Sequence, residues 1–365
     1  MQMHLTLGLV ACALLGLQTE ARAEPYLAVR AGQKCVSCHV NPTGGGKRTV
    51  YGNVYGQNQL SRKFIPVGDD VVDYLNGEIT KWLAIGGNSR GSFNYTDVPN
   101  QDSQSEFEVD RATIYAELRL IPNLLTLYLD EQVAPGGATS REAFALITPM
   151  RGRYTLKVGK FFLPYGLRIE DDSAFIRQAT GINFDTPDNG VEAGLELGPW
   201  SAQFAITNGT AGGAENDSDK QFSLLATYVK PMWRVGASFN FNDADVGDRQ
   251  MQNVFFGLRT GPIAWLAEVD YIQDEGTPTG DRDQWAGLVE GNWLVTRGHN
   301  LKLTYEFLDP DDDVDEDERT RYSLVWEYSP FQFTQARAGV RLYDGIPQND
   351  LQNRDEVFIQ LHVYF

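Results

Sequence analysis

The chain has 365 residues, a formal charge of −18 at pH 7 and a mean hydropathy of −0.34. After its first 20 residues the chain contains no apolar run of about 18 residues, the length that a membrane-spanning helix needs. The acidic balance argues against nucleic acid as a partner, because phosphates would be repelled, and it favours cations. A β-barrel remains open, since a barrel gives only every second residue of a strand to lipid.

The N-terminus has the features of an export signal. An apolar stretch from Leu5 to Leu17 precedes the small-residue site Ala21-Arg22-Ala23, so residues 1–23 are predicted to be a cleaved signal peptide and the mature chain to start near Glu24. Leu9-Val10-Ala11-Cys12 also fits a lipoprotein cleavage site, which would leave Cys12 lipidated. The apolar stretch continues past Cys12, which favours the ordinary signal.

A five-residue motif, Cys35-Val36-Ser37-Cys38-His39, follows the signal. Two thiols at this spacing add to the two vinyl groups of haem, and the adjacent imidazole binds the iron. We therefore predict one covalent haem c, attached at Cys35 and Cys38, with His39 as the proximal ligand. The alternatives are a structural disulfide or half of a zinc site. A zinc site would need a second cysteine pair, and a disulfide would not need His39.

The segment that carries the motif, residues 24–79, is short for an independent domain. Below about 70 to 80 residues a single core seldom stabilises itself, so we expect the haem to act as the staple. Residues 40–149 contain neither His nor Met. The sixth position of the iron is therefore open or supplied by a later part of the chain. His362 is the leading candidate, and the weaker ones are His299, Met150, Met232, Lys34, Lys47 and the amino group near Glu24.

The rest of the chain, residues 80–365, alternates apolar and polar positions. The last ten residues place Val357, Ile359 and Leu361 on one face and Gln360 and His362 on the other, which is typical of a strand between lipid and a lumen. About sixteen such segments occur, joined alternately by short turns and long polar loops. Short turns belong to the periplasmic rim. The sequence therefore predicts an all-β, antiparallel transmembrane barrel of about 16 strands, with both termini in the periplasm of the cell's outer membrane.

Three strands illustrate the predicted faces. The residues expected to face lipid are Ala112, Ile114, Ala116, Leu118, Leu120, Trp233, Val235, Ala237, Phe239, Leu301, Leu303, Tyr305 and Phe307. The residues expected in the lumen are Arg111, Thr113, Tyr115, Glu117, Arg119, Arg234, Gly236, Ser238, Lys302, Thr304 and Glu306. Arg or Lys on the lipid face would cost about 2 to 4 kcal/mol at the midplane. For any single lumenal charge, simple solvation is the default interpretation.

The longest loop, Phe162 to Asn189, is third among the predicted outer loops. The stretches Gly159-Lys160-Phe161-Phe162-Leu163-Pro164-Tyr165-Gly166 and Phe175-Ile176-Arg177 resemble the corresponding part of the phosphate-selective porin family. The resemblance implies that the loop folds inward and narrows the pore. Phosphate selectivity is not carried over, because the net charge is negative and no Lys or Arg cluster stands out.

The surroundings of the motif carry a second resemblance. The residues Ala28 to Cys35, Asn41-Pro42-Thr43, Arg48, Tyr51-Gly52 and Tyr55 resemble the N-terminal segment of the fused cytochrome-porins of iron-oxidising bacteria. This resemblance covers sequence over about 35 residues and architecture over the whole chain. It implies an electron conduit. Apart from the resemblance, we expect Tyr51 and Tyr55 to pack on the haem, with electron relay as the alternative. Gly44-Gly45-Gly46 departs from the family pattern, so the identity of the electron donor is not carried over.

An acidic loop, Asp309 to Glu318, is predicted to lie outside the cell. It lacks the turn glycine and the carboxylate spacing of a calcium-binding loop. Solvated negative charge is the simpler interpretation. The functional alternative is attraction of Fe(II), Ca²⁺ or the cations that bridge lipopolysaccharide.

The predicted function is electron transfer across the outer membrane, and the candidate activity is that of an Fe(II) oxidase that acts as a conduit. Its expected partners are a periplasmic cytochrome or other electron carrier, an extracellular metal ion or redox couple, and outer-membrane lipid. The alternative is a solute porin whose haem segment is a plug, a sensor or a stabilising element. A haem peroxidase would need a distal acid-base residue, and the sequence offers no candidate.

Overall fold

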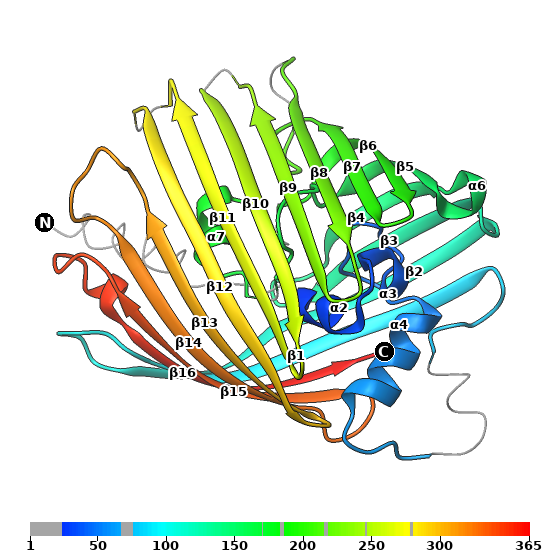
Figure 1. Cartoon of the computed structure of the whole chain (residues 1–365), viewed down its shortest axis with the longest axis horizontal. Helices are drawn as coiled ribbons and strands as arrows, with labels where there is room; N and C mark the ends of the chain where they lie inside the picture. Colours follow the sequence, from blue (N-terminus) through cyan, green and yellow to red (C-terminus); the bar gives the residue numbers. More distant parts are fainter. Residues whose placement is uncertain are drawn as a thin grey trace, which may run out of the picture.

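Sixteen strands form one closed antiparallel barrel in this computed structural model, which describes residues 24–66, 76–169, 171–182, 186–214, 218–244, 247–277 and 280–365. Each strand pairs with its neighbours along the chain, and β1 closes the barrel against β16 (Figure 1). The predicted fold class and strand number are confirmed. The predicted signal peptide, residues 1–23, lies outside the described residues.

The strands are β1 (Leu83–Asp97), β2 (Gln104–Ile121), β3 (Leu125–Ala134), β4 (Thr139–Ile147), β5 (Tyr154–Phe161), β6 (Asp188–Leu197), β7 (Trp200–Thr207), β8 (Gln221–Val229), β9 (Trp233–Asn242), β10 (Asp248–Thr260), β11 (Ile263–Glu275), β12 (Arg282–Thr296), β13 (His299–Asp309), β14 (Arg319–Tyr328), β15 (Thr334–Asp344) and β16 (Asp355–Tyr364). The helical elements are α2 (Pro25–Ala31), α3 (Cys35–Cys38), α4 (Val50–Tyr55), the π-helical turn η1 (Gly56–Leu60), α6 (Pro149–Gly152), α7 (Phe175–Thr180) and the 3₁₀ turn η2 (Asp350–Asn353). None of the helices in the described residues is long and apolar enough to cross a membrane.

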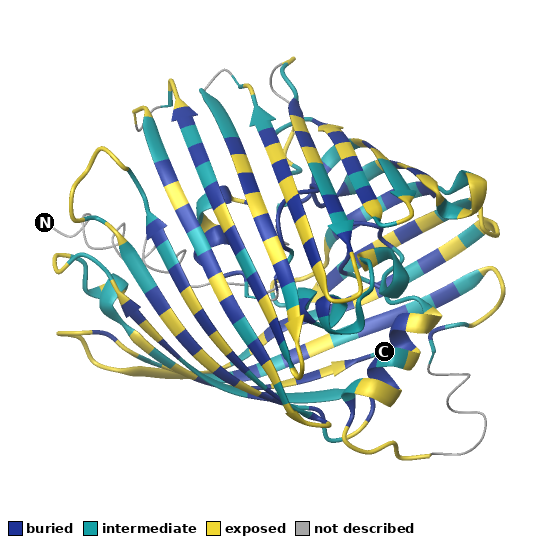
Figure 2. Cartoon of the chain, viewed as in Figure 1, coloured by how far each residue is buried: buried dark blue, intermediate teal, exposed yellow. Residues whose placement is uncertain are grey.

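The two faces of the wall follow the predicted alternation. Along β2, Ile114 is 56% exposed, whereas its neighbours Thr113 and Tyr115 are buried. The same alternation of exposed and buried positions runs along most strands (Figure 2). Successive side chains of a strand point to opposite faces, so the exposed apolar row lies outside and the polar row inside. The face assignments made from sequence are confirmed.

The two ends of the barrel differ. Short turns join β6 to β7, β8 to β9, β10 to β11 and β12 to β13, and β16 ends at the same rim. The N-terminal segment is attached to this short-turn rim, where the amide of Arg62 donates to Ser329 and that of Lys63 to Pro330. The long connections, including the acidic loop, lie at the opposite rim.

The N-terminal segment lies inside the short-turn end of the barrel (Figure 1). Polar contacts fix it to strands around the wall. Tyr26 donates to Glu327 on β14 at 2.7 Å, Lys34 pairs with Glu196 on β6 at 2.7 Å, Asn41 donates to Glu142 on β4 at 2.7 Å, and Lys47 pairs with Glu117 on β2 at 3.1 Å. Contacts with the barrel wall therefore stabilise the N-terminal segment, in addition to any stabilisation that a haem would provide.

The long loop after β5 also enters the lumen, as the sequence predicted. Arg177 of α7 pairs with Glu268 on β11 at 2.9 Å, and Asp171 pairs with Arg321 on β14 at 2.9 Å. Apolar residues of the loop, Leu167 and Ile176, share a buried core with Tyr26 of α2. The wall contributes Ala264, Leu266, Ala286, Leu288 and Leu308 to that core. The interior is thus partly apolar and is occupied by two parts of the chain.

Candidate functional site

A single cavity lies between the N-terminal segment, the inward loop and the barrel wall. It has about 1480 Å³ of empty space, part of it open to solvent. Cys35, Cys38, His39 and His362 all line it. The structure therefore brings together the four site residues that the sequence singled out.

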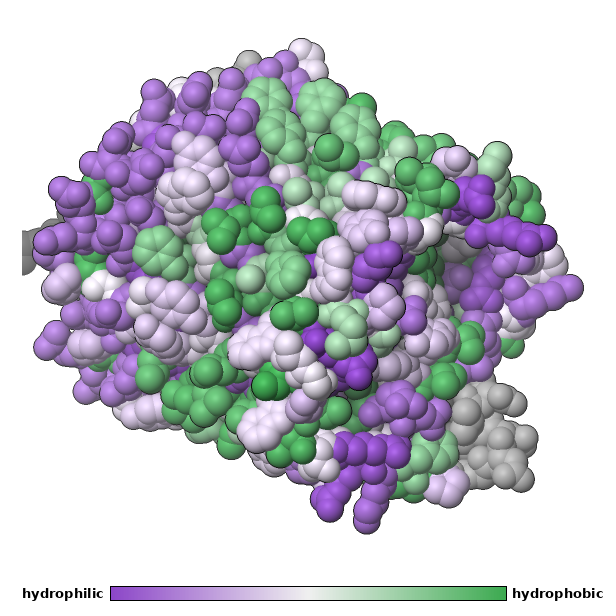
Figure 3. Space-filling view, viewed as in Figure 1, coloured by the Kyte–Doolittle hydropathy of each residue, from purple (hydrophilic) through white to green (hydrophobic). Residues whose placement is uncertain are grey.

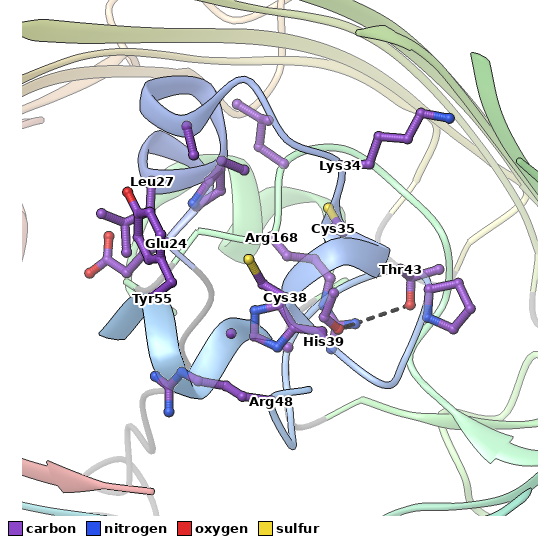
Figure 4. A pocket seen from close by; sticks show the side chains of 18 of the residues that line it. Glu24, Leu27, Lys34, Cys35, Cys38, His39, Thr43, Arg48, Tyr55 and Arg168 are labelled. Carbon is purple, nitrogen blue, oxygen red and sulfur yellow. Dashed lines mark hydrogen bonds between the residues drawn. The ribbon is translucent and has the colours of Figure 1, made fainter. Parts of the chain in front are cut away.

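The motif itself is one helical turn followed by extended backbone. α3 runs from Cys35 to Cys38, and the amide of His39 donates to the carbonyl of Cys35 at 3.0 Å. Both cysteines are free thiols, and Figure 4 shows their sulfur atoms in the cavity beside the His39 ring. The turn presents two thiols and an imidazole to one space, which is the arrangement that covalent haem attachment needs.

The glycine run that departs from the family pattern forms a tight turn behind the motif. Gly44, Gly45 and Gly46 have φ of 91°, 76° and 63°, a region that residues with a side chain seldom adopt. A Cβ on Gly46 would lie 2.1 Å from the hydroxyl oxygen of Tyr128, and that hydroxyl accepts a hydrogen bond from the amide of Lys47. The turn brings Arg48 back to pair with His39 in an isolated β-bridge.

His39 is held as a neutral imidazole. Burial, together with the positive charges of Arg48 and Arg168, lowers the pKa of His39 to about 3. Its Nδ1 atom is buried and has no hydrogen-bond partner among the described residues. A neutral imidazole is the form that binds a metal. This observation fits a haem iron at His39.

Cationic side chains surround the same cavity. Arg48, Arg168 and Arg234 line it with Lys34. Arg48 lies over the ring of Tyr364 at 4.2 Å, and Arg168 donates to the carbonyl of Gly44 at 2.5 Å. A haem carries two propionate carboxylates, which guanidinium groups bind well. Apolar residues complete the lining, namely Leu27, Leu167, Leu225, Val229 and Phe255. The residues present therefore fit a haem.

Among the His and Met residues of the described chain, only His39 and His362 line this cavity. His362 is buried on the lumenal face of β16, with its Nδ1 3.2 Å from Oε1 of Gln335. His299 instead stacks on Tyr328 with ring centroids 4.4 Å apart and accepts from the indole of Trp326. Met150 and Met232 are exposed. Ligation by His362 stays a prediction that this placement favours.

Two lysine candidates have other partners. Lys34 lies in the cavity but is paired with Glu196, and Lys47 is paired with Glu117. Of the two tyrosines expected on the haem, Tyr55 lines the cavity, whereas Tyr51 is 47% exposed. Tyr51 is therefore better placed to meet solvent or a partner than a cofactor.

Some site residues were missed by sequence reasoning. Arg168 and Leu167 come from the inward loop, and no local pattern assigns them to the N-terminal segment. Phe255 points inward from β10, and Leu266 and Leu288 do so from β11 and β12. A signal for these apolar residues was available, because the stretches Ile263 to Ala267 and Ala286 to Val289 lose the polar half of the alternation.

The acidic loop is distant in sequence from this cavity. Carboxylate oxygens of Asp311, Asp312 and Asp313 lie within 4.8 Å of one another. Their exposure is consistent with the simpler interpretation of solvated charge.

No family model and no curated protein matches the sequence. Solved structures do match the fold. An anion-selective porin from Comamonas acidovorans has a TM-score of 0.61 at 11% identity, over 78% of this chain and 99% of that one. The outer-membrane protein OmpT of Vibrio cholerae has a TM-score of 0.59 at 16% identity, over 78% and 97%. The outer-membrane channel DcaP of Acinetobacter baumannii has a TM-score of 0.57 at 13% identity, over 78% and 97%.

The chain has a porin-like fold. At these identities the likeness concerns the architecture of the barrel alone. It does not show whether the N-terminal segment holds a cofactor or what passes through the lumen.

Proposed function

We propose that this protein is an outer-membrane electron-transfer protein that carries one covalent haem c inside its barrel. It would carry electrons between an extracellular redox couple, with Fe(II) as the candidate, and a periplasmic carrier. The observation that carries the proposal is the single cavity that Cys35, Cys38, His39 and His362 line together.

The chain's own residues have distinct tasks at this site. Cys35 and Cys38 would hold the edge of the macrocycle, and His39 would bind the iron as a neutral imidazole. Arg48 and Arg168 would neutralise the propionates, while Leu167 and Phe255 exclude water from the ring. A bound haem supplies reversible one-electron chemistry, and the protein supplies ligation, electrostatics and access.

The outer surface supports insertion in the outer membrane. Hydrophobic residues cover much of the middle of the wall, and the side of the view that holds the long loops is mainly hydrophilic (Figure 3). Exposed Trp residues occur on β9, β11, β12 and β14, where amphipathic rings suit a membrane interface. Short turns belong to the periplasmic rim, so the N-terminal segment and Phe365 would face the periplasm.

The second candidate is a solute porin in which the N-terminal segment is a plug. Its support is the fold that the chain shares with porins and channels, one of them described as anion-selective. The polar contacts that fix the segment to β2, β4, β6 and β14 suit a plug as well as they suit a conduit.

The two candidates differ in what they carry across a vesicle membrane, namely electrons for the conduit and solutes for the porin. Vesicles with an entrapped electron acceptor are supplied with external Fe(II), and reduction inside is followed optically beside solute-induced swelling. The proposal predicts reduction with little swelling, and loss of reduction in Cys35→Ser/Cys38→Ser. Swelling without reduction would support the porin and overturn the conduit.

A further inference from the structure

One helix separates the haem cavity from solvent at the short-turn end. Gly52, Tyr55 and Gly56 line the cavity, whereas Val50, Tyr51 and Val54 of α4 are 42%, 47% and 39% exposed. α4 therefore presents opposite faces to the cofactor space and to solvent. With its side chains a helix is about 10 to 12 Å across, so a molecule resting on α4 would lie close to the haem.

The backbone of α4 is fixed closely to the haem motif. A Cβ on Gly52 would lie 2.2 Å from the carbonyl oxygen of Cys38, which shows how near the two backbones run. The hydroxyl of Thr49 donates to the carbonyl of Ser37 at 2.9 Å, and the amide of Thr49 donates to Cys38 at 2.9 Å. The exposed apolar face of α4 is thus rigidly held over the site.

Basic residues lie at the C-terminal end of the helical stretch that α4 and η1 form. Arg62 and Lys63 are exposed, and backbone hydrogen bonds to Ser329 and Pro330 fix their positions. Arg297 donates to the carbonyls of Asn58 and Ser61 at 2.7 and 2.8 Å and is itself exposed. Around the rest of the short-turn rim the exposed basic residues are Lys81, Arg151, Arg153, Lys230 and Arg259.

This rim is unlike the rest of a chain whose formal charge is −18. Two of its described carboxylates, Glu78 and Glu196, are paired with Arg119 and Lys34, at 2.6 and 2.7 Å. The C-terminal carboxylate of Phe365 also lies at this rim. Residues 67–75, which contain three aspartates, lie outside the described residues. Among the described residues the rim exposes eight cations, which outnumber its carboxylates. An apolar centre with a charged border is the usual form of a transient protein interface.

We propose that the exposed face of α4, together with Arg62, Lys63 and Arg297 at the end of the helical stretch, is the docking surface for an acidic soluble redox protein. The inference rests on the proposed function and specifies the partner of the same site. Complementary charge would steer the partner to the rim, and the apolar centre would seat it above the haem. The periplasmic carrier would then exchange electrons across α4.

The test uses the full-length haem-loaded protein in detergent, with acidic plastocyanin as the probe and a basic cytochrome c as the charge control. Arg62→Glu/Lys63→Glu should lower the bimolecular electron-transfer rate with plastocyanin about tenfold at low salt, with the difference fading at high salt. Both residues are fixed by backbone hydrogen bonds, so their side chains can be changed without removing those contacts. The rate with the basic cytochrome should not fall.

The matched control is Arg151→Glu/Arg153→Glu, the same charge change on the turn between β4 and β5, across the barrel from β14. It should change the plastocyanin rate less than about twofold. Tyr51→Ser should weaken plastocyanin binding without altering the salt dependence. Equal losses of the plastocyanin rate in both double variants would mean that the overall charge of the protein, and not this surface, sets the rate, and would overturn the docking surface. No loss of rate in either double variant would also overturn it.

Plastocyanin binding to immobilised Cys35→Ser/Cys38→Ser protein separates this inference from the proposed function. Binding that persists there, and falls in the Arg62→Glu/Lys63→Glu background, supports the surface without reference to haem. Wild-type protein that lacks haem but binds plastocyanin would remove the proposed function and leave the surface standing. Haem-loaded protein that neither binds nor reacts with plastocyanin would overturn the surface alone.

Discussion

At the scale of single residues, the contrast between His362 and His299 is the most informative. Both were candidates for the sixth position of the iron, and both lie near the short-turn rim. His362 is buried on the lumenal face and lines the cavity, while His299 stacks in an aromatic group with Trp326 and Tyr328. The alternation of β13 and β16 decides this, because successive residues face opposite sides of the wall.

His362→Ala should therefore change both the absorption spectrum and the midpoint potential of the haem, since loss of an axial ligand alters the electronic state of the iron. His299→Ala, the matched control, should leave both unchanged. Spectra and redox titrations of the purified variants make the comparison. Unchanged spectra and potential in His362→Ala would exclude ligation by this residue.

Gly46 offers a second test at this scale. Its positive φ would cost another residue about 1 to 2 kcal/mol, and a Cβ there would also collide with Tyr128. Gly46→Ala should thus lower the haem content and make the N-terminal segment sensitive to protease. Gly136→Ala has a similar φ of 79° but nothing within 4 Å of the added Cβ. It should retain wild-type haem content, and equal losses in both variants would contradict the role assigned to the turn.

At the scale of elements, the inward loop depends on a few charged contacts. Burial alone would raise the pKa of Asp171, but Arg321 and Arg341 outweigh it and hold that pKa below its usual range. The two guanidinium groups lie 2.9 and 3.1 Å from the carboxylate. The ion pairs therefore stabilise the loop above the ordinary aspartate pKa of about 3.9, and this stabilisation is lost as pH falls through the lower pKa of the folded state.

Asp171→Asn should release this contact at every pH, at a cost of about 2 kcal/mol for a pair that keeps some solvent exposure. Single-channel recordings in planar bilayers should show higher or noisier conductance for the variant at pH 7. In strong acid the wild type should approach the variant. A wild-type conductance that rises already between pH 7 and 5 would contradict this account of the loop.

The strands of the barrel could be predicted from the sequence. The position of the N-terminal segment could not, because it depends on contacts between residues far apart in the chain. Period-two alternation is a local property, so it placed Ile114 outside and Arg111 inside. The spacing of Cys35 and Cys38 singled out residues that line one cavity, and haem attachment there stays a prediction. The seat of the N-terminal segment depends on pairs such as Tyr26 and Glu327, which are 301 positions apart. No local pattern encodes such a pair. The lumenal charges were expected to be solvated, but Lys157 and Glu192 are fully buried and 2.9 Å apart.

At the scale of the whole molecule, the barrel and its contents are separable in principle. β1 to β16 close on themselves through backbone pairing without help from the N-terminal segment. The segment and the inward loop then share one apolar core inside the wall. Deletion of residues 24–66 should thus leave a folded barrel with a larger and steadier conductance. Heat-modifiable gel mobility reports folding, and planar-bilayer recordings report conductance; a folded variant with unchanged conductance would show that the segment does not close the lumen.

The central claim is a haem bound covalently within the lumen of a membrane barrel. The most direct measurement is the haem content of the protein purified from outer membranes, by pyridine haemochrome assay and intact mass. The account predicts one haem per chain, retained after denaturation and absent from Cys35→Ser/Cys38→Ser. Wild-type protein without a haemochrome band, or recovered in the soluble periplasmic fraction, would contradict it.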